Sequence, residues 1–212
     1  MIPYNFMAIE GNIGAGKTSL ATMISEKFNA RLILEQFEDN SFLPKFYKDP
    51  ERYAFPLELS FLADRFQQLK KHLHSHDLFS SFTVADYFIN KSLIFARKTL
   101  SPDEFALYQK LFSIMSLTLP RPDLLVYLYM NLTRLRDNIV SRGRPYEQSI
   151  TEEYLEKIQN SYLDFIREQP NLRVIIIDTN KVDFVHNSLD FELLLEIISS
   201  NYDVGVHRIR AK

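Results

Sequence analysis

The 212-residue sequence contains no cysteine. Disulfide bonds, thiolate nucleophiles and cysteine-bound zinc are therefore excluded, and the absence suits a reducing cytoplasm. Long apolar runs are also lacking, since no stretch approaches the ~20 residues needed to cross a bilayer. Residues 1–5 have neither the basic segment nor the apolar run of a signal peptide. From these features we expect a cytoplasmic protein that has no membrane partner.

The sequence also lacks an excess of charge of either sign. Its 25 Lys and Arg residues face 27 Asp and Glu residues, for a formal net charge of −2. No general basic field would therefore draw the protein to a nucleic acid polymer. No internal repeat, low-complexity tract or linker rich in Pro, Gly or Ser divides the chain. Because this length can bury a sizeable core, we expect a single domain over residues 1–212.

Short apolar runs alternate with longer helical patterns, as is typical of parallel α/β proteins. Five runs are apolar nearly throughout, as strands covered on both faces should be: Phe6–Ile9, Arg31–Leu34, Phe82–Ala85, Leu124–Tyr129 and Arg173–Ile177. Helical patterns lie at 51–73, 102–117, 133–141, 151–168 and 189–199. We therefore expect a three-layer α/β fold in which helices flank a five-stranded parallel sheet.

A glycine-rich stretch follows the first expected strand and matches the eight-residue P-loop pattern at every specified position. It reads Gly11, Asn12, Ile13, Gly14, Ala15, Gly16, Lys17 and Thr18. Glycine lets successive backbone N–H groups converge on phosphate oxygens, and the start of the following helix adds partial positive charge. Lys17 would reach the β- and γ-phosphates, and the Thr18 hydroxyl would coordinate Mg²⁺. The motif predicts binding of a nucleoside triphosphate.

Two carboxylates fall at the carboxyl ends of expected strands, where ligands bind in open α/β sheets. Glu35 follows the second strand and Asp86 the third. Glu35 would accept a proton from an attacking hydroxyl, and Asp86 would hold Mg²⁺ directly or through water. Glu35 is followed by further acidic residues at 38 and 39, and these negative charges would repel an acceptor that is already a phosphate. The acceptor is therefore expected to be an alcohol.

Arg142 and Arg144 flank Gly143, just after a helical pattern that contains Arg134 and Arg136. Two guanidinium groups around a glycine would form a mobile clamp over the transferring phosphoryl group. The alternative is a solvated basic helix end, which the helix dipole favours. Because the chain also carries a phosphate loop, we expect the clamp and not the solvated helix end.

These motifs, taken together, resemble those of the deoxyribonucleoside kinases, and the resemblance extends over almost the whole length of the sequence. The resemblance rests on the P-loop, on Glu35, and on the stretches FYKDPERYAFPLELSFLADR (46–65), KSLIFA (91–96), RPDLLVYL (121–128) and RGRPYEQ (142–148). It implies a P-loop kinase fold that transfers the γ-phosphate of ATP to the 5′-hydroxyl of a deoxyribonucleoside in nucleotide salvage. It also implies a homodimer.

The resemblance further implies roles for individual residues. Glu35 is the base for the 5′-hydroxyl, and Tyr47 and Glu147 hydrogen-bond the 3′-hydroxyl. Glu58 and Arg65 read the nucleobase, and Arg142 and Arg144 belong to a lid over about residues 142–150. One departure concerns the Arg that the family places after the third strand, because this chain reads Asp86-Tyr87-Phe88. Lys91 is a candidate substitute for that Arg.

The residues at 58 and 65 bear on the base. They lie seven apart in a helical pattern, close to two turns, and therefore share a line bordering its apolar stripe. As a carboxylate Glu58 only accepts hydrogen bonds, whereas Arg65 only donates them. This combination fits a purine better than thymine, and the alternative is that Glu58 and Arg65 pair with each other. A glutamine, common in the family at this position, would both donate and accept.

Two other functions stay open at this point. The first is a nucleoside monophosphate kinase of thymidylate type, which the acidic surroundings of Glu35 disfavour. The second is a kinase-derived structural subunit, which the lost Arg after Asp86 favours slightly. Retention of Lys17, Thr18, Glu35, Arg142 and Arg144 disfavours it.

Overall fold

The computed structural model describes residues 2–36, 40–73 and 80–211. These residues form one parallel sheet of six strands in the order β2-β3-β1-β4-β5-β6. The strands are β1 (Phe6–Gly11), β2 (Arg31–Ile33), β3 (Thr83–Ala85), β4 (Leu124–Tyr129), β5 (Arg173–Asp178) and β6 (Gly205–Arg210). The three-layer α/β arrangement is confirmed, and all five expected strands are present within one or two residues of their expected bounds.

The expectation of five strands is wrong by one, because it omits β6. This strand pairs with β5 at the edge of the sheet, and its residues alternate between half-buried and exposed. One face of this strand, with Val206, Arg208 and Arg210, is exposed, so the segment reads as a mixture of polar and apolar residues. A search for continuous apolar runs passes over such a strand.

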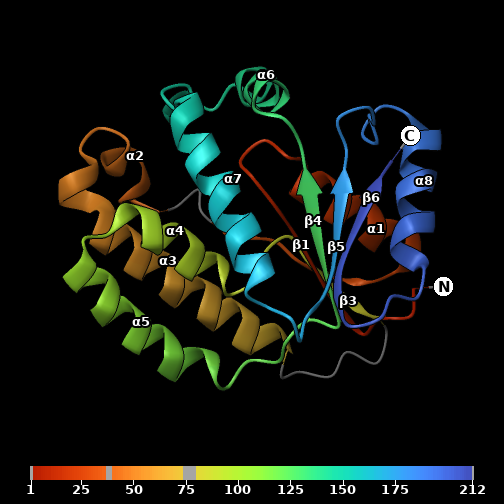
Figure 1. Ribbon diagram of the computed structural model, residues 1–212, viewed down its shortest axis with the longest axis horizontal. Helices are drawn as coiled ribbons and strands as arrows, with labels where there is room; N and C mark the ends of the chain where they lie inside the picture. The colour runs from red at the N-terminus through yellow and green to blue at the C-terminus, as the bar shows by residue number, and fades with distance from the viewer. Residues whose placement is uncertain (1, 37–39, 74–79, 212) are drawn as a thin grey trace.

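Helices cover both faces of the sheet (Figure 1). They are α1 (Lys17–Phe28), α2 (Leu43–Phe46), α3 (Pro50–Leu73), α4 (Lys91–Thr99), α5 (Pro102–Ser116), α6 (Leu132–Arg142), α7 (Glu152–Arg167) and α8 (Ser188–Ser199), with a 3₁₀ turn, η1, at Pro145–Glu147. Two of them, α2 and α4, are not among the helices expected from the sequence. No helix among the described residues is long and apolar enough to cross a membrane.

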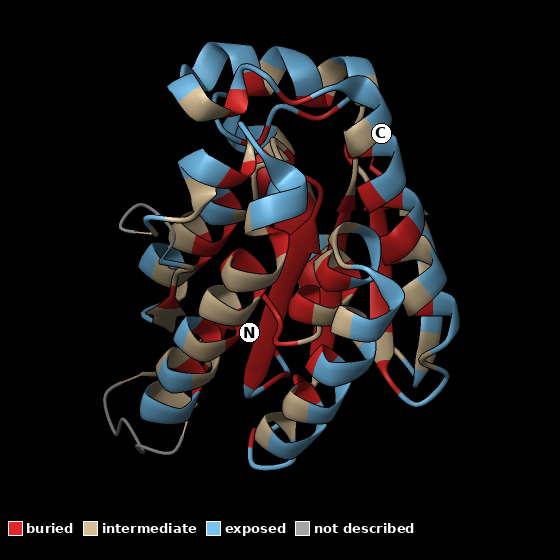
Figure 2. Ribbon diagram, turned by 90° about the vertical axis from the view of Figure 1, so that its left-hand side faces the viewer, coloured by how far each residue is buried: buried red, intermediate tan, exposed pale blue. Residues whose placement is uncertain are grey.

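The two faces of the sheet bury separate apolar cores because side chains alternate along each strand. On β4, Leu124 and Val126 join a core that includes Leu20 of α1 and Leu194 of α8. Leu125 and Tyr127 point the other way, into a core formed with α3, α4, α5 and α7. The central strands β1, β4 and β5 are almost entirely buried, while the outer helix faces are exposed (Figure 2). This packing fixes the carboxyl edge of the sheet, above which α6 and η1 lie.

Candidate active site

The phosphate loop connects β1 to α1 at the carboxyl edge of the sheet. Gly14 and Gly16 both have a φ of 85°, in the left-handed region that favours glycine. A Cβ at Gly14 would lie 2.7 Å from the carbonyl oxygen of Leu135, and one at Gly16 would lie 2.7 Å from the Phe184 ring. Space as well as φ therefore requires glycine here. The loop is held between α1, α6 and the segment that carries Phe184.

Lys17 is the first residue of α1, and its ammonium group turns back over the loop to donate to the carbonyl oxygen of Asn12 at 2.9 Å. Burial, followed by the positive charge of Lys91, lowers the pKa of Lys17 to about 8. An anion close to this ammonium would favour its charged form. The arrangement suits a polyphosphate.

Asp86 links the phosphate loop to Glu35. The Thr18 hydroxyl donates to Oδ2 of Asp86 at 2.6 Å, and the backbone N–H of Glu35 donates to Oδ1 at 2.7 Å. Asp86 is buried and directly follows β3, whose neighbour in the sheet is β2. Two strand ends and the start of α1 therefore meet at one carboxylate.

The side chain of Glu35 is held by two cations. Nε of Arg65 donates to Oε1 at 2.7 Å, and the ammonium of Lys91 lies 2.5 Å from Oε2. Burial alone would raise the pKa of Glu35, but the charges of Lys91 and Arg65 outweigh it and lower the pKa to about 2. Glu35 is therefore ionised at neutral pH, and both of its oxygens are fixed in direction.

Arg65 contacts Glu35 and Ser92, whose hydroxyl accepts from Nη1 at 2.8 Å. Among the described residues no hydrogen bond joins Arg65 to Glu58. The alternative in which these two side chains pair with each other along α3 is therefore wrong. Glu58 itself is 3% exposed, and its Oε1 lies 2.9 Å from the hydroxyl of Thr99. Its Oε2 is buried without a hydrogen-bond partner in the described part of the chain.

Burial raises the pKa of the Glu58 carboxyl to about 7, although Arg65 and Thr99 act to lower it. The sequence pattern alone treats Glu58 as a permanent carboxylate. The structure differs, because the deep position on α3 disfavours the charged form. Near neutral pH both protonation states of Glu58 are populated.

The two expected lid arginines lie on either side of Gly143, the residue that ends α6 with a φ of 71°. Arg142 and Arg144 both contact the buried carboxylate of Glu147, Arg144 at 3.4 Å. The other two basic residues of this region lie elsewhere. Arg134 donates to the backbone carbonyls of residues 179, 180 and 182, and the exposed Arg136 lies 3.8 Å from Glu152.

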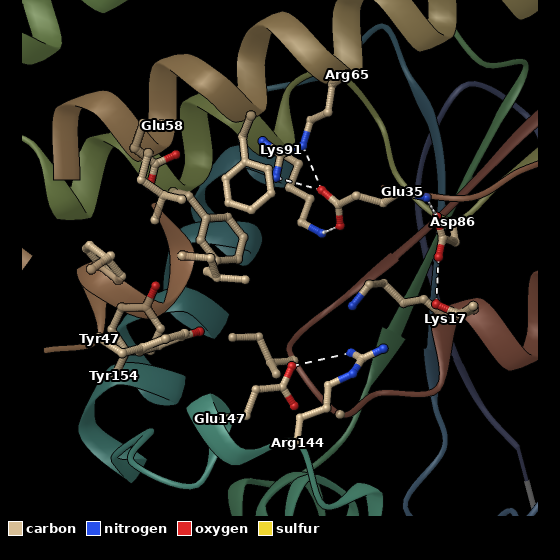
Figure 3. Close-up of a pocket in the computed structure, with 18 of the residues that line it drawn as sticks. Lys17, Glu35, Tyr47, Glu58, Arg65, Asp86, Lys91, Arg144, Glu147 and Tyr154 are labelled. Atoms are coloured by element: carbon tan, nitrogen blue, oxygen red, sulfur yellow. Dashed lines mark hydrogen bonds and ion pairs between the residues drawn. The ribbon is translucent and has the colours of Figure 1, made fainter. Parts of the chain in front are cut away.

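One pocket brings most of these side chains together (Figure 3). Lys17 and Asp86 lie at one side of it, Glu58 and Tyr47 at the other, and Glu35 lies with Arg65 and Lys91 along its upper wall. The ring of Tyr47 stacks on that of Tyr146, with 6.2 Å between centroids. The lining also includes Ile13, Gly14, Thr18, Leu43, Phe46, Leu57, Phe61, Phe95, Arg142, Arg144, Glu147 and Tyr154. The pocket thus runs from the glycine-rich loop at one end to an aromatic and carboxylic end.

The oxygen atoms beside the phosphate loop fit a magnesium ion. Mg²⁺ prefers oxygen ligands and is commonly bound through one or two protein oxygens together with substrate phosphates. The Thr18 hydroxyl and the Asp86 carboxylate supply such oxygens next to Lys17. Among the described residues no group of three or more Asp, Glu, His or Cys side chains forms a metal cage of its own. A metal at this place would therefore depend on the bound phosphates.

Comparison with known proteins agrees with this geometry. A sequence model described as deoxynucleoside kinase matches residues 7–201. The chain belongs to the deoxynucleoside kinase family. It is 41% identical over 191 residues to a deoxyguanosine kinase of Bacillus subtilis, covering 88% of this chain and 92% of the relative. It is 32% identical over 202 residues to a deoxyadenosine kinase of Dictyostelium discoideum, covering 93% of this chain and 79% of the relative.

The fold of this deoxynucleoside kinase also matches solved structures. A deoxyadenosine kinase from M. mycoides with bound dATP superposes with a TM-score of 0.79, covering 92% of this chain and all of the other, at 23% identity. At that identity the likeness concerns the fold. The family and the α/β kinase fold implied by the sequence motifs are therefore both confirmed.

Some site features were not visible in the sequence. The contacts of Thr99 with Glu58 and of Ser92 with Arg65 join helices α3 and α4, and no local pattern signals them. Phe184, which packs on Gly16, lies in a segment without a motif. The acidic residues that follow Glu35 in the sequence, Glu38 and Asp39, lie outside the described residues.

Proposed function

We propose that this deoxynucleoside kinase transfers the γ-phosphate of ATP to the 5′-hydroxyl of a purine deoxyribonucleoside. The observation that supports it most is the shared pocket in which Lys17 and Thr18 line one end, Glu58 the other, and Glu35 the wall between them. A nucleoside that lays its base at Glu58 would present its sugar hydroxyl towards Glu35 and the phosphate loop.

In this proposal Glu35 receives the proton of the 5′-hydroxyl as the oxygen attacks the γ-phosphorus and the bond to ADP breaks. A base with a pKa of about 2 takes up a proton weakly before the transfer, so its contribution lies in orienting the hydroxyl and accepting the proton late. Lys91 and Arg65 hold its oxygens in place. Phosphoryl transfer needs positioning and charge stabilisation more than covalent chemistry.

The phosphate groups of the donor are assigned to the P-loop and Lys17. Thr18 and Asp86 would hold Mg²⁺, which neutralises phosphate charge when bound. Arg142 and Arg144 would leave Glu147 and contact the transferring phosphoryl group, and Tyr47 and Glu147 would bind the 3′-hydroxyl of the sugar. The contact of both arginines with Glu147 supports a link between sugar binding and the position of the lid.

A purine is proposed because Glu58 faces the base end of the pocket with one unpartnered oxygen among the described residues. Two relatives of this chain are described as a deoxyguanosine kinase and a deoxyadenosine kinase, which supports the same substrate class. The thymidylate-type alternative requires cations for an anionic acceptor, and the cations beside Glu35, Arg65 and Lys91, are already paired with its carboxylate. The structural-subunit alternative gains no support from an intact chain of contacts through Thr18, Asp86 and Glu35.

The test is a turnover panel. The purified protein would be incubated with ATP and Mg²⁺ and with each of the four natural deoxynucleosides, or with thymidine monophosphate, and the products separated by chromatography. We expect 5′-monophosphates of deoxyguanosine or deoxyadenosine. Highest kcat/KM with thymidine or deoxycytidine would reject the purine assignment, and turnover of the monophosphate alone would reject the acceptor hydroxyl.

Further properties expected from the sequence, from its composition or from the family resemblance, are proposals of the same kind. We infer a homodimer, which sedimentation would test, and a cytoplasmic location, which cell fractionation would test. We also infer that residues 1–212 act as one kinase domain, with a lid at about 142–150. Limited proteolysis with and without ATP would show whether the lid segment becomes protected.

A further inference from the structure

Glu58 occupies an unusual place for a carboxyl group. It is 3% exposed, it lies at the end of the pocket away from the phosphate loop, and its Oε2 has no hydrogen-bond partner among the described residues (Figure 3). A buried polar atom without a hydrogen-bond partner destabilises the folded state. Glu58 lines the pocket, so a ligand that reaches its carboxyl group can supply the missing hydrogen bond.

The other oxygen of Glu58 is held by a contact that suits both protonation states. The Thr99 hydroxyl lies 2.9 Å from Oε1 of Glu58 and 3.1 Å from the backbone carbonyl oxygen of Phe95. The hydroxyl has one proton, and the carbonyl oxygen only accepts. If Thr99 donates to Glu58, the carboxyl is ionised or presents its proton at Oε2. If Thr99 donates to Phe95, Glu58 donates to Thr99.

We propose that Glu58 distinguishes the two purine bases through its protonation state. As a carboxylate it accepts a hydrogen bond from N1–H of guanine, and as a carboxylic acid it donates through Oε2 to N1 of adenine, which has no hydrogen. This inference rests on the proposed function and adds to it. Binding of a deoxyguanosine to protonated Glu58 releases that proton to solvent, and binding of a deoxyadenosine to ionised Glu58 takes one up.

The tyrosines that face Glu58, and the carboxylate of Glu35, keep their charge states near neutral pH. Burial raises the pKa of the surrounding tyrosines, so they stay neutral, and Glu35 stays ionised with its pKa of about 2. Burial raises the pKa of Glu58 to about 7, so both of its states are available. The facing groups are Arg65 on α3, Lys91 on α4, Tyr108 on α5, Tyr154 on α7, and Tyr47 and Glu35 in the loops that follow α2 and β2.

Lys17 also titrates close to this range, with a pKa of about 8. It lies at the phosphate end of the pocket and serves the same step with either nucleoside. Its effect therefore cancels in the ratio of kcat/KM for deoxyguanosine to kcat/KM for deoxyadenosine. That ratio isolates the group that contacts the base.

The first experiment measures this ratio at saturating ATP and Mg²⁺ between about pH 6 and about pH 8, where we expect it to rise by up to about tenfold per pH unit. A ratio that stays constant within about twofold over that range overturns the proposal. Glu51→Gln, an exposed substitution on the same helix, is the matched control and should leave the pH dependence of the ratio unchanged.

The second experiment uses Glu58→Gln. The amide both donates and accepts at every pH, so the ratio should lose its pH dependence and shift towards deoxyadenosine. Circular dichroism and a thermal melt check that the variant is folded. A folded variant whose ratio still follows pH as in the unmutated protein would assign the switch to another group and overturn the proposal.

A third measurement needs no variant. Calorimetry of nucleoside binding is carried out in two buffers of different ionisation enthalpy. The difference in observed enthalpy gives the number of protons released or taken up on binding. Deoxyguanosine should release close to one proton at about pH 6 and little at about pH 8, and deoxyadenosine should take up protons with the opposite pH dependence. Equal proton counts for the two nucleosides overturn the proposal. If the proposed function itself fails, neither nucleoside is phosphorylated at any pH, whereas failure of this inference alone leaves both turned over at a constant ratio.

Discussion

The ammonium group of Lys91 lies 2.5 Å from Oε2 of Glu35, 56 residues away in the sequence. Arg65 holds the other oxygen of the same carboxylate, so Glu35 is fixed between two cations. The chain has Tyr87 where the family resemblance places an Arg after the third strand. Lys91, which begins α4, supplies a positive charge at Glu35 from a different position in the sequence.

Lys91→Met should lower kcat by ~10–10² with a smaller effect on the nucleoside KM, because a misplaced base affects the reacting geometry most. Lys91→Arg keeps the charge and should retain more of the activity than the Met variant. Steady-state kinetics of both variants, beside the exposed control Lys98→Met on the same helix, would check this. Equal activity of the Met variant and the unmutated protein would leave Lys91 as a packing residue.

Glu35→Gln should cut kcat by ~10²–10⁴, the range for loss of a positioned general base. ATP affinity should change little, because the Glu35 side chain bonds to Arg65 and Lys91 and its backbone N–H contact with Asp86 is kept. Steady-state kinetics would measure kcat and an ATP binding titration would measure the affinity for ATP, with the exposed Glu26→Gln on α1 as the control. A near-normal kcat would remove Glu35 from the mechanism.

Much of the fold, but less of the site, could be predicted from the sequence. Five of the strands were predictable because residues buried on both sheet faces must be apolar nearly throughout. β6 was not, because Gly205–Arg210 has one side in solvent and reads as a mixed polar segment. Likewise, α4 is short and begins with the buried polar residues Lys91 and Ser92, which face the site instead of an apolar core.

For the site, local motifs predicted which residues gather but not how they pair. The P-loop and the strand-end position of Glu35 follow from backbone geometry that sequence spacing encodes. Arg65 and Glu58 share one line on α3, yet Arg65 turns to Glu35 and Glu58 turns to Thr99. The charge state of Glu58 depends on burial by several helices, which spacing along one helix does not report.

The two lid arginines give a separate prediction. Arg142→Ala and Arg144→Ala should each lower kcat by ~10-fold or more while weakening nucleoside binding less, because a group that acts on transition-state charge affects kcat first. The exposed Arg136→Ala on α6 serves as the control, since its partner Glu152 lies outside the pocket. A variant that raised only the nucleoside KM would place the arginine in sugar binding through Glu147.

The 2.6 Å contact between Thr18 and Asp86 bears on the metal. Asp86 accepts from the Thr18 hydroxyl through Oδ2 and from the Glu35 backbone through Oδ1, so it is already oriented towards the place where Thr18 meets the phosphates. Asp86→Asn keeps the shape but removes a negative charge that attracts a divalent cation. Activity of this variant should therefore need ~10-fold more Mg²⁺ for half-saturation, since Mg²⁺ sites of this kind rely on one or two carboxylates.

A magnesium titration at fixed ATP would measure this shift for Asp86→Asn, with the exposed Asp103→Asn on α5 as the control. The amide introduced by Asp86→Asn keeps one oxygen, which can still accept from either Thr18 or Glu35, but its nitrogen would face the other donor. A thermal melt therefore accompanies the titration and separates loss of structure from loss of metal binding. An unchanged magnesium midpoint in a folded variant would show that Asp86 acts by positioning Thr18 and Glu35 and not through the metal.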